Sequence, residues 1–401
     1  MAGAGAVFQL NGDRRQLFVD VSELCQRDAA TGVQRVVRNY VRQLLDTPIR
    51  GFSVEPVYAT IKEEYRYARE FTARLFGLPV MEANDLPIRW QRGDVFFGLD
   101  MQHDVQLAQS DFYSRLRRDG VVVKFLVHDL LPIQLAEPFF VSEAKELHEA
   151  WLTMIASNDG AICVSRATAD AYREWIDDNS VGCAPEFRLD WTHIGADIDG
   201  DDSDTEAPAA PALPLLPMSD RLTFLCVATL EPRKRQQQIL GACELLWGEG
   251  IDVSLVLVGQ QGWHVDELVQ RLDDQPEKGR RLFWLQGISD EHLMQIYRAS
   301  TCLVAASVNE GFGLPLIEAA RYGKPLIVRD IPVFREVAGD YAFYFSGDDA
   351  SDLATALLSW LELYRKNEHP RSAGMQWLSW RESTDRLKKL LLEKNYKRKQ
   401  L

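Results

Sequence analysis

The sequence lacks the usual marks of an exported or membrane-spanning protein. Its six cysteines include no C-x-x-C pair and no metal-ligand spacing, so we expect them to be reduced and mostly buried. No apolar run reaches the roughly 18 residues that a spanning helix needs, and the first residues carry no positive segment before an apolar core. These absences predict a cytoplasmic protein that is neither exported nor inserted in a membrane.

Positive charge is also in short supply. The 45 Lys and Arg residues against 59 Asp and Glu residues give a formal net charge of −14, which argues against general nucleic-acid binding because phosphate contacts need a basic surface. Any anionic ligand must therefore be bound by a local group of cations. Hydrophobic residues make up 46% of the 401 positions and charged residues 26%, which is typical of a soluble globular protein long enough for two or three domains.

A change of composition divides the chain near its middle. From 194 to 220 the sequence is rich in Asp, Pro and Ala, with four prolines between Pro208 and Pro217. Prolines exclude a helix and the acidic residues are hard to bury, so this segment is predicted to be an extended linker. We predict a first domain at 1–195, a linker at 196–220, a second domain at 221–370, and C-terminal helices at 371–401 that cross back to the first domain.

Apolar runs of strand length alternate with helical stretches in both halves. The predicted strands are 17–21, 95–99, 121–127 and 160–164 in the first half, and 222–229, 253–259, 282–285, 302–307 and 326–329 in the second. Strands that are apolar throughout indicate parallel sheets with helices on both faces. The predicted fold is therefore α/β, with two doubly wound, Rossmann-like domains facing a central cleft and with ligands bound at the carboxyl ends of the strands.

The most informative motif, NEGFGLPLIE, follows the strand predicted at 302–307. Its two glycines and Pro315 suit a tight turn into a helix, where backbone N–H groups favour a negative charge. Glu310 and Glu318, with seven residues between them, add carboxylates that accept hydrogen bonds from hydroxyl groups. The combination predicts a ligand that has both phosphates and sugar hydroxyls.

Further polar residues follow other predicted strands. Arg233, Lys234 and Arg235 come after strand 222–229 and are suited to neutralise a diphosphate and the growing charge of a leaving group. Which of the three faces inward stays open, and a solvated basic turn is the alternative. His128 ends strand 121–127, where a histidine can contact a reacting group or merely cap the loop.

The segment NEGFGLPLIEAARYGKPLIV resembles the glutamate signature of retaining glycosyltransferases of family 4, which have the two-domain GT-B fold. The likeness extends through most of residues 222–340, including VATLEPRK and QGISDEHLMQIYRAS, and more weakly into VSELCQRDAATGVQRVVRNY and VHDLLP. Those two segments resemble the bacterial mannosyl- and rhamnosyltransferases that build surface polysaccharides. One departure is that Arg233 and Lys234 are adjacent, whereas many members space their basic pair more widely.

The resemblance implies a metal-independent, retaining hexosyltransferase with a nucleotide diphosphate sugar, best GDP-mannose, as donor substrate and no cofactor. It implies that Glu318 binds the ribose, that Glu310 binds hydroxyls of the donor sugar and that His128 lies near the anomeric carbon. The candidate catalytic residues are His128, Glu310, Arg233 and Lys234. The donor-binding candidates are Gly32, Arg233, Lys234, Ile288, Glu310, Gly311, Phe312, Gly313, Leu314 and Glu318, and the acceptor-side candidates are Asp100, His103 and Asp129.

Two positions in the predicted helix after residue 31 have alternative interpretations drawn from the residues alone. Gly32 either lets the backbone approach a phosphate or sugar, or is an ordinary helix start. Arg35, on the same helix, either reaches a phosphate across the cleft or lies on a solvated helix face.

The partner implied by the resemblance is a growing surface polysaccharide or a lipid-linked oligosaccharide. The stretch from Arg386 to Lys399 is strongly basic and carries several leucines. It is predicted to contact the inner face of the plasma membrane peripherally or to form a terminal helix packed on the first domain, and the two roles are compatible. No nucleic-acid partner is expected.

Four other functions compete with mannosyl transfer: rhamnosyl transfer from dTDP-rhamnose, nucleotide-sugar epimerisation, a sugar phosphorylase activity and a catalytically silent interaction module. A phosphorylase is expected to have a much longer chain and a pyridoxal-binding lysine. An epimerase needs further acid and base residues, which the sequence does not identify. A silent module is disfavoured because both glutamates and the basic pair are present.

Overall fold

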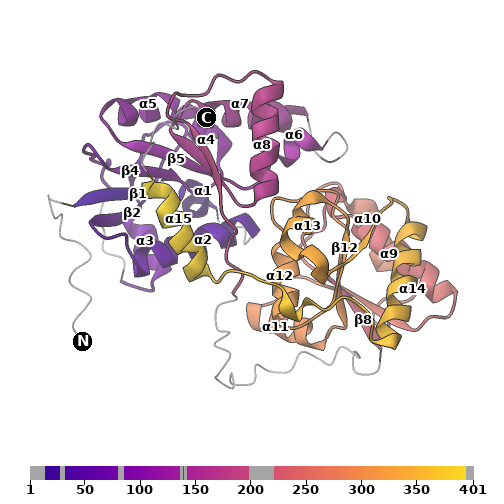
Figure 1. Ribbon diagram of the computed structural model, residues 1–401. Helices are drawn as coiled ribbons and strands as arrows, with labels where there is room; N and C mark the ends of the chain where they lie inside the picture. Colours follow the sequence, from indigo (N-terminus) through magenta and orange to yellow (C-terminus); the bar gives the residue numbers. More distant parts are fainter. Residues whose placement is uncertain are drawn as a thin grey trace.

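The computed structural model describes residues 14–27, 32–79, 85–135, 139, 142–197 and 221–393. Two sheets form the centres of two domains, and helices pack around each of them (Figure 1). The strand order is β3-β2-β1-β4-β5-β6-β7 in the first sheet and β10-β9-β8-β11-β12-β13 in the second. Strand β3 is antiparallel to β2, and the other described strand pairs are parallel. The predicted α/β class with two doubly wound domains is confirmed.

In the first domain the strands are β1 (Arg15–Asp20), β2 (Phe52–Tyr58), β3 (Arg66–Tyr67), β4 (Val95–Gly98), β5 (Val122–Val127), β6 (Gly160–Cys163) and β7 (Arg188–Trp191). The helices are α1 (Ser22–Gln26), α2 (Gly32–Asp46), α3 (Arg69–Leu75), α4 (His103–Ala108), α5 (Ser110–Arg118), α6 (Leu131–Gln134), α7 (Ser142–Ala156) and α8 (Arg166–Asp178). The sequence analysis missed β2, β3 and β7, which lie toward the sides of the sheet and mix polar with apolar residues.

In the second domain the strands are β8 (Leu222–Val227), β9 (Val253–Val258), β10 (Leu282–Leu285), β11 (Cys302–Ala305), β12 (Leu326–Arg329) and β13 (Phe343–Phe345). The α-helices are α9 (Gln236–Gly248), α10 (Asp266–Asp274), α11 (Asp290–Ala299), α12 (Leu314–Arg321), α13 (Pro332–Ala338) and α14 (Ala350–Lys366), and the short 3-10 helices are η1 (Pro232–Lys234), η2 (Gly339–Tyr341) and η3 (Ser372–Gly374). The five strands predicted here begin where the structure places them, and only β13 was missed.

The last described helix, α15 (Trp380–Leu392), follows the second domain in sequence but packs beside α2 of the first (Figure 1). The buried Trp380 ring meets Tyr40 edge-on with centroids 5.5 Å apart, and the Tyr40 and Ser383 hydroxyls are 2.7 Å apart. Lys124, buried in β5, donates from Nζ to the backbone oxygen of Leu390 at 2.6 Å. A cation at the carbonyl end of a helix is favourable, so this contact helps to hold α15 on the first domain.

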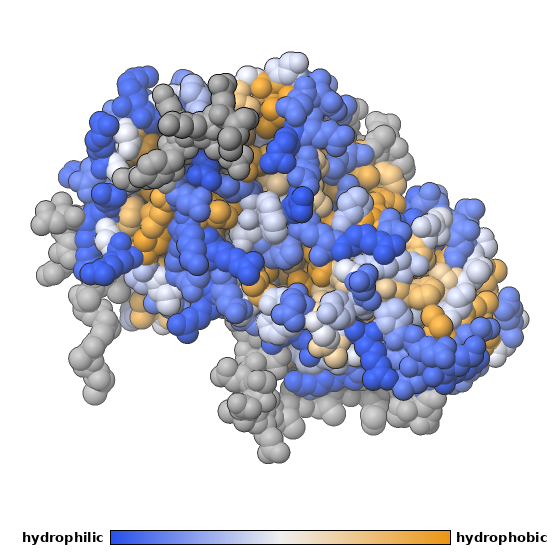
Figure 2. Space-filling view, in the orientation of Figure 1, coloured by the Kyte–Doolittle hydropathy of each residue, from blue (hydrophilic) through white to orange (hydrophobic). Residues whose placement is uncertain are grey.

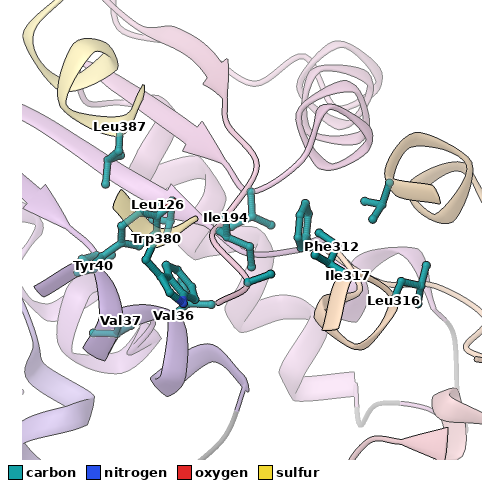
Figure 3. Packing of buried hydrophobic residues seen from close by; sticks show 14 of the residues in the cluster. Val36, Val37, Tyr40, Leu126, Ile194, Phe312, Leu316, Ile317, Trp380 and Leu387 are labelled. Atoms are coloured by element: carbon teal, nitrogen blue, oxygen red, sulfur yellow. The ribbon is translucent and has the colours of Figure 1, made fainter. Parts of the chain in front are cut away.

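The two domains share one apolar cluster. Figure 3 shows Ile194, at the end of the first domain, between Trp380 on one side and Phe312 of the second domain on the other. Ile317 and Leu316 continue the same cluster into α12. The cluster therefore spans the place where the chain leaves the first domain, although the predicted linker lies, apart from residues 196 and 197, outside the described residues.

The surface fits the sequence-based expectations in part. Hydrophilic residues cover much of both domains in Figure 2, and no helix among the described residues has the length and hydropathy to cross a membrane. All six cysteines are unpaired, and four of them are buried. Of the basic C-terminal stretch, Leu387 and Leu391 are buried against the first domain, which confirms the packed-helix alternative up to residue 393; residues 394–401 lie outside the described part.

Substitution of Gly195 by alanine should weaken the packing of α15 on the first domain. Gly195 pairs with Leu378 in an isolated bridge, and a Cβ at this position would lie 2.4 Å from the Cα atom of Trp380. Backbone cannot yield as a flexible side chain does, so we expect the Gly195→Ala variant to lose about 1–3 kcal/mol of unfolding free energy, measured by urea titration. Hydrogen exchange in α15 should rise in parallel.

The matched control is Gly182→Ala, since no atom lies within 4 Å of the Cβ that alanine would add there. If both variants unfold at the same urea concentration, the close packing of Gly195 against Trp380 does not stabilise the protein.

Candidate active site

The candidate site starts from an ion-paired cluster at the carboxyl ends of β8 and β11, which are neighbours in the second sheet. Arg233 and Lys234 lie in η1 after β8, and Glu310 lies in the loop after β11. Arg233 Nη1 is 3.1 Å from Glu310 Oε2, and Lys234 Nζ ion-pairs with the other carboxylate oxygen. The structure thus brings together three residues that the sequence analysis selected separately.

Charge balance decides the state of Glu310. Burial by itself would raise the pKa of this carboxyl group, but the attraction of Lys234 and Arg233 outweighs it and lowers the pKa to about 2. Arg233 also ion-pairs through Nε with Glu231 Oε2 at 2.8 Å. Glu310 is therefore anionic, and the two cations are already neutralised by carboxylates.

Arg235 turns away from this cluster. Its backbone is left-handed, with φ of 56°, and its guanidinium lies 3.4 Å from Asp348 and over the ring of Phe139. It lines a separate cavity of about 860 Å³ between α9, α10 and the start of α14. Of the three adjacent basic residues, Arg233 and Lys234 contact Glu310, which settles the question of orientation that the sequence left open.

Glu318, in α12, is bound from both domains. It is buried and accepts a hydrogen bond from the Tyr297 hydroxyl at 2.7 Å. Its other carboxylate oxygen lies 2.5 Å from Nη1 of Arg35, which belongs to α2 of the first domain. The solvated-face alternative for Arg35 is therefore wrong. The Arg35 side chain reaches across to the buried carboxylate of Glu318 in the second domain.

The backbones of the two domains approach each other closely at Gly311. A Cβ at Gly311 would lie 1.9 Å from the backbone oxygen of His128. The Ser165 and Thr168 hydroxyls donate to the Gly311 carbonyl at 2.7 and 3.1 Å. Two residues later, Gly313 has φ of 96° and precedes α12, a conformation that favours glycine.

His128 is buried against this glycine loop. Burial lowers its pKa to about 4, although a hydrogen bond with the backbone of Leu99 favours the protonated ring. Since a contact that favours the proton is one in which the ring donates, the nitrogen facing Leu99 carries the hydrogen. The other nitrogen, Nε2, is buried and has no hydrogen-bond partner within the described part of the chain, so it is left as an acceptor for a ligand.

The remaining candidates are placed as follows. Asp100 is buried and accepts from the backbone N–H groups of Leu24 and Met101 at 2.7 and 3.0 Å, while burial and nearby Asp20 raise its pKa to about 7. Asp129 accepts from the Leu131 backbone at 3.1 Å. These contacts make both carboxylates helix caps in this structure.

Three further candidates differ in their surroundings. Gly32 is the exposed first residue of α2 and has open space around its Cβ position. Ile288 is partly buried in the loop between β10 and α11. His103 pairs with His148 at 3.0 Å.

A second cross-domain contact escaped the sequence analysis. Glu336, in α13, accepts from the backbone N–H groups of Arg166 and Ala167 at 2.8 and 2.7 Å, at the start of α8 in the first domain. Its carboxylate also lies 2.7 Å from His193 Nε2. A single glutamate inside a helix gives no sequence signal for this role, because its partners are about 140 to 170 residues away.

The space at the centre of the cluster is small. A cavity of about 20 Å³ lies there, and Ala228, Lys234, Ser307, Glu310 and Gly313 are among its lining residues. A cavity of that size holds about one water molecule. In this structure the Glu310 carboxylate contacts both Arg233 and Lys234.

The chain is similar in sequence to known glycosyltransferases. Residues 215–377 match the family described as Glycosyl transferases group 1. The chain is 40% identical over 380 residues to serotype-specific mannosyltransferase WbdA of Escherichia coli, covering 94% of this chain and 45% of that protein. It is 30% identical over 177 residues to O-antigen chain mannosyltransferase B of Escherichia coli, covering 42% of this chain and 45% of that protein. The chain thus spans less than half the length of the serotype-specific mannosyltransferase WbdA.

Solved structures support the fold. A crystal structure of Anabaena Alr3699/HepE with UDP and glucose has a TM-score of 0.63 at 16% identity, with 94% of this chain and 99% of that chain covered. Sucrose-phosphate synthase from Thermosynechococcus elongatus has a TM-score of 0.61 at 15% identity, with coverage of 94% and 98%. These neighbours share the two-domain GT-B architecture. Residues 215–377, most of which belong to the second domain, are thus a Glycosyl transferases group 1 domain.

Proposed function

We propose that this protein is a retaining mannosyltransferase that moves mannose from GDP-mannose to a growing surface polysaccharide or lipid-linked oligosaccharide. The similarity to a protein named as a serotype-specific mannosyltransferase supports the sugar and the polymer class. The choice of GDP rests on the sequence resemblance of the first half. Rhamnosyl transfer, epimerisation and a silent module gain no support from the comparisons.

The observation that carries this proposal is the pairing of Arg233 and Lys234 with Glu310. In this structure the Glu310 carboxylate neutralises both cations. A nucleotide diphosphate offers the same cations a stronger anion and releases Glu310 to accept hydrogen bonds from hydroxyls of the sugar. The cations then stabilise the charge that grows on the diphosphate as the sugar departs, which is the role of a metal ion in other transferases.

The other donor contacts follow from the same exchange. Glu318 is assigned to the ribose hydroxyls, in competition with Arg35 of the first domain. Backbone N–H groups from Gly311 to Leu314 lie at the start of α12 and suit the diphosphate end of the donor, and the Ile288 loop is assigned to the base. Gly32 adds first-domain backbone near the phosphates.

His128 is assigned to the reacting sugar. Its buried Nε2 atom is an acceptor without a partner among the described residues, next to the Gly311 loop. A buried acceptor without a hydrogen bond lowers the stability of the fold, and a ligand that donates to it removes this cost. A donor hydroxyl near the anomeric carbon satisfies this acceptor. Asp100 and Asp129, which cap helices beside this residue, are assigned to shaping the acceptor side.

We place the enzyme in the cytoplasm, in peripheral contact with the inner face of the plasma membrane. The buried leucines of α15 leave its exposed basic residues, such as Arg386 and Lys389, as the contact surface. The attraction is then electrostatic and should weaken with salt.

The direct test of the function is transfer with identification of the product. We expect the chain to transfer mannose from GDP-mannose to an α-mannose oligosaccharide, with dTDP-rhamnose inactive, in the presence of EDTA. Transfer should survive EDTA because Arg233 and Lys234 supply the positive charge. Proton NMR of the product should show the anomeric configuration of the donor, because the family is retaining by resemblance. An inverted anomer contradicts retention, and activity that needs added Mg²⁺ contradicts metal independence.

The two adjacent cations give a matched pair of variants. Lys234→Met should weaken binding of GDP about 10- to 100-fold, since a charged hydrogen bond contributes roughly 1.5–3 kcal/mol. Arg235→Met should leave that affinity within about twofold, because the Arg235 side chain faces Asp348. Isothermal titration measures both, and thermal unfolding checks that each variant folds. Equal losses in the two variants contradict the assignment of Lys234 to the diphosphate.

Glu318 can be tested against its own ion-pair partner. We expect Glu318→Gln to weaken GDP-mannose binding about tenfold or more, because a charged acceptor of ribose hydroxyls is lost. Arg35→Gln removes the same ion pair but leaves the carboxylate free. If the Glu318→Gln variant binds GDP-mannose as tightly as the wild type in the same titration, the assignment of Glu318 to the ribose hydroxyls is wrong.

A further inference from the structure

Two histidines in the first domain form a chain of hydrogen bonds with a fixed direction. His103 begins α4, and His148 lies in the middle of α7. Nε2 of His103 is 3.0 Å from Nδ1 of His148, and Nε2 of His148 is 3.1 Å from the backbone oxygen of Asp129. Both rings pack against Trp151, with centroids 4.9 and 5.2 Å away.

The direction follows from the last link. A carbonyl oxygen only accepts, so Nε2 of His148 must carry a hydrogen. Burial lowers the pKa of His148 to about 4, and burial together with His148 lowers the pKa of His103 to about 4. Both rings are therefore neutral near pH 7, and Nδ1 of His148 is an acceptor. His103 must donate from Nε2, which leaves a lone pair on its Nδ1 atom.

The chain of histidines reaches the candidate site through Asp129, whose Cβ atom would lie 3.2 Å from a Cβ at Gly311. It ends on the backbone of Asp129, the residue after His128, and His128 itself touches the Gly311 loop. His103 follows β4 and Asp129 follows β5, which are neighbours in the sheet. The ion-paired cations and carboxylates assigned to the donor lie mostly in the second domain. We therefore expect the acceptor saccharide to bind on the first-domain side of the site.

We propose that Nδ1 of His103 accepts a hydrogen bond from a hydroxyl of the acceptor saccharide, and that His148 is a positioning residue that fixes the tautomer of His103. The inference rests on the proposed function and names the chemistry of its second substrate. An acceptor nitrogen favours a hydroxyl over a phosphate dianion at the contacted position of the sugar, because the dianion has no hydrogen to donate. Nothing in this role requires His103 to take up a proton.

Two variants of His148 separate positioning from packing. His148→Leu keeps an apolar body but removes the acceptor for His103, so His103 can move its hydrogen to Nδ1. His148→Asn offers an oxygen near the former Nδ1 position and should restore the bond. In the full chain, we expect the Leu variant to raise the KM for an α-mannose oligosaccharide about 3- to 10-fold, with the KM for GDP-mannose unchanged and with rescue by the Asn variant.

The tautomer can be read without any transfer assay. Nitrogen-15 NMR of the histidine rings should show His103 with its hydrogen on Nε2 in the wild-type protein and a shift toward Nδ1–H in His148→Leu. A wild-type His103 with the hydrogen on Nδ1 overturns the inference, as does a Leu variant whose acceptor KM stays within twofold. If the wild-type chain shows the expected tautomer but transfers no mannose, the proposed function fails and not the histidine geometry.

Discussion

The arrangement of the site depends on two carboxylates buried at the junction of the domains. A buried carboxylate is costly unless a cation and hydrogen bonds compensate it, and removal of one partner from such a pair is strongly destabilising. Glu310 takes its cations from η1 in its own domain, whereas Glu318 takes Arg35 from the other domain. Ion pairs within and between the domains thus compensate both carboxylates, and the proposed donor would exchange these internal partners for its own groups.

The same junction explains why glycine stands at position 311. The Gly311 backbone meets the backbone oxygen of His128, where a side chain has no room, and its carbonyl is held by Ser165 and Thr168. The loop that carries Glu310 is therefore fixed from the first domain.

Local patterns predicted most of the fold and the parts of the site that lie within one segment. Continuous apolar runs located the central strands, while β2, with a glutamate and a proline in its sequence, gave no clear period. The signature around Glu310 and Glu318 and the basic run after β8 were visible because each is contiguous. The Arg35–Glu318 pair joins residues 283 positions apart, and the turn of Arg235 depends on a left-handed backbone that no sequence period reveals. Such features follow from tertiary packing alone.

The route of the chain limits how the domains can separate to admit a donor. The chain leaves the first domain near Gly195 and returns beside it at Leu378, and the two crossings are bonded to each other: the Ala196 N–H donates to the Leu378 oxygen at 3.1 Å. Asp197 then accepts from the Trp380 backbone N–H at 2.5 Å, while Trp380 stays buried on the first domain. Two crossings fastened side by side restrain sliding more than rotation, which is the geometry of a hinge. We expect rotation about these crossings to separate Arg35 from Glu318 while the contacts of Trp380 with the first domain stay intact, so that the charge exchange proposed for donor binding accompanies the opening of the domains.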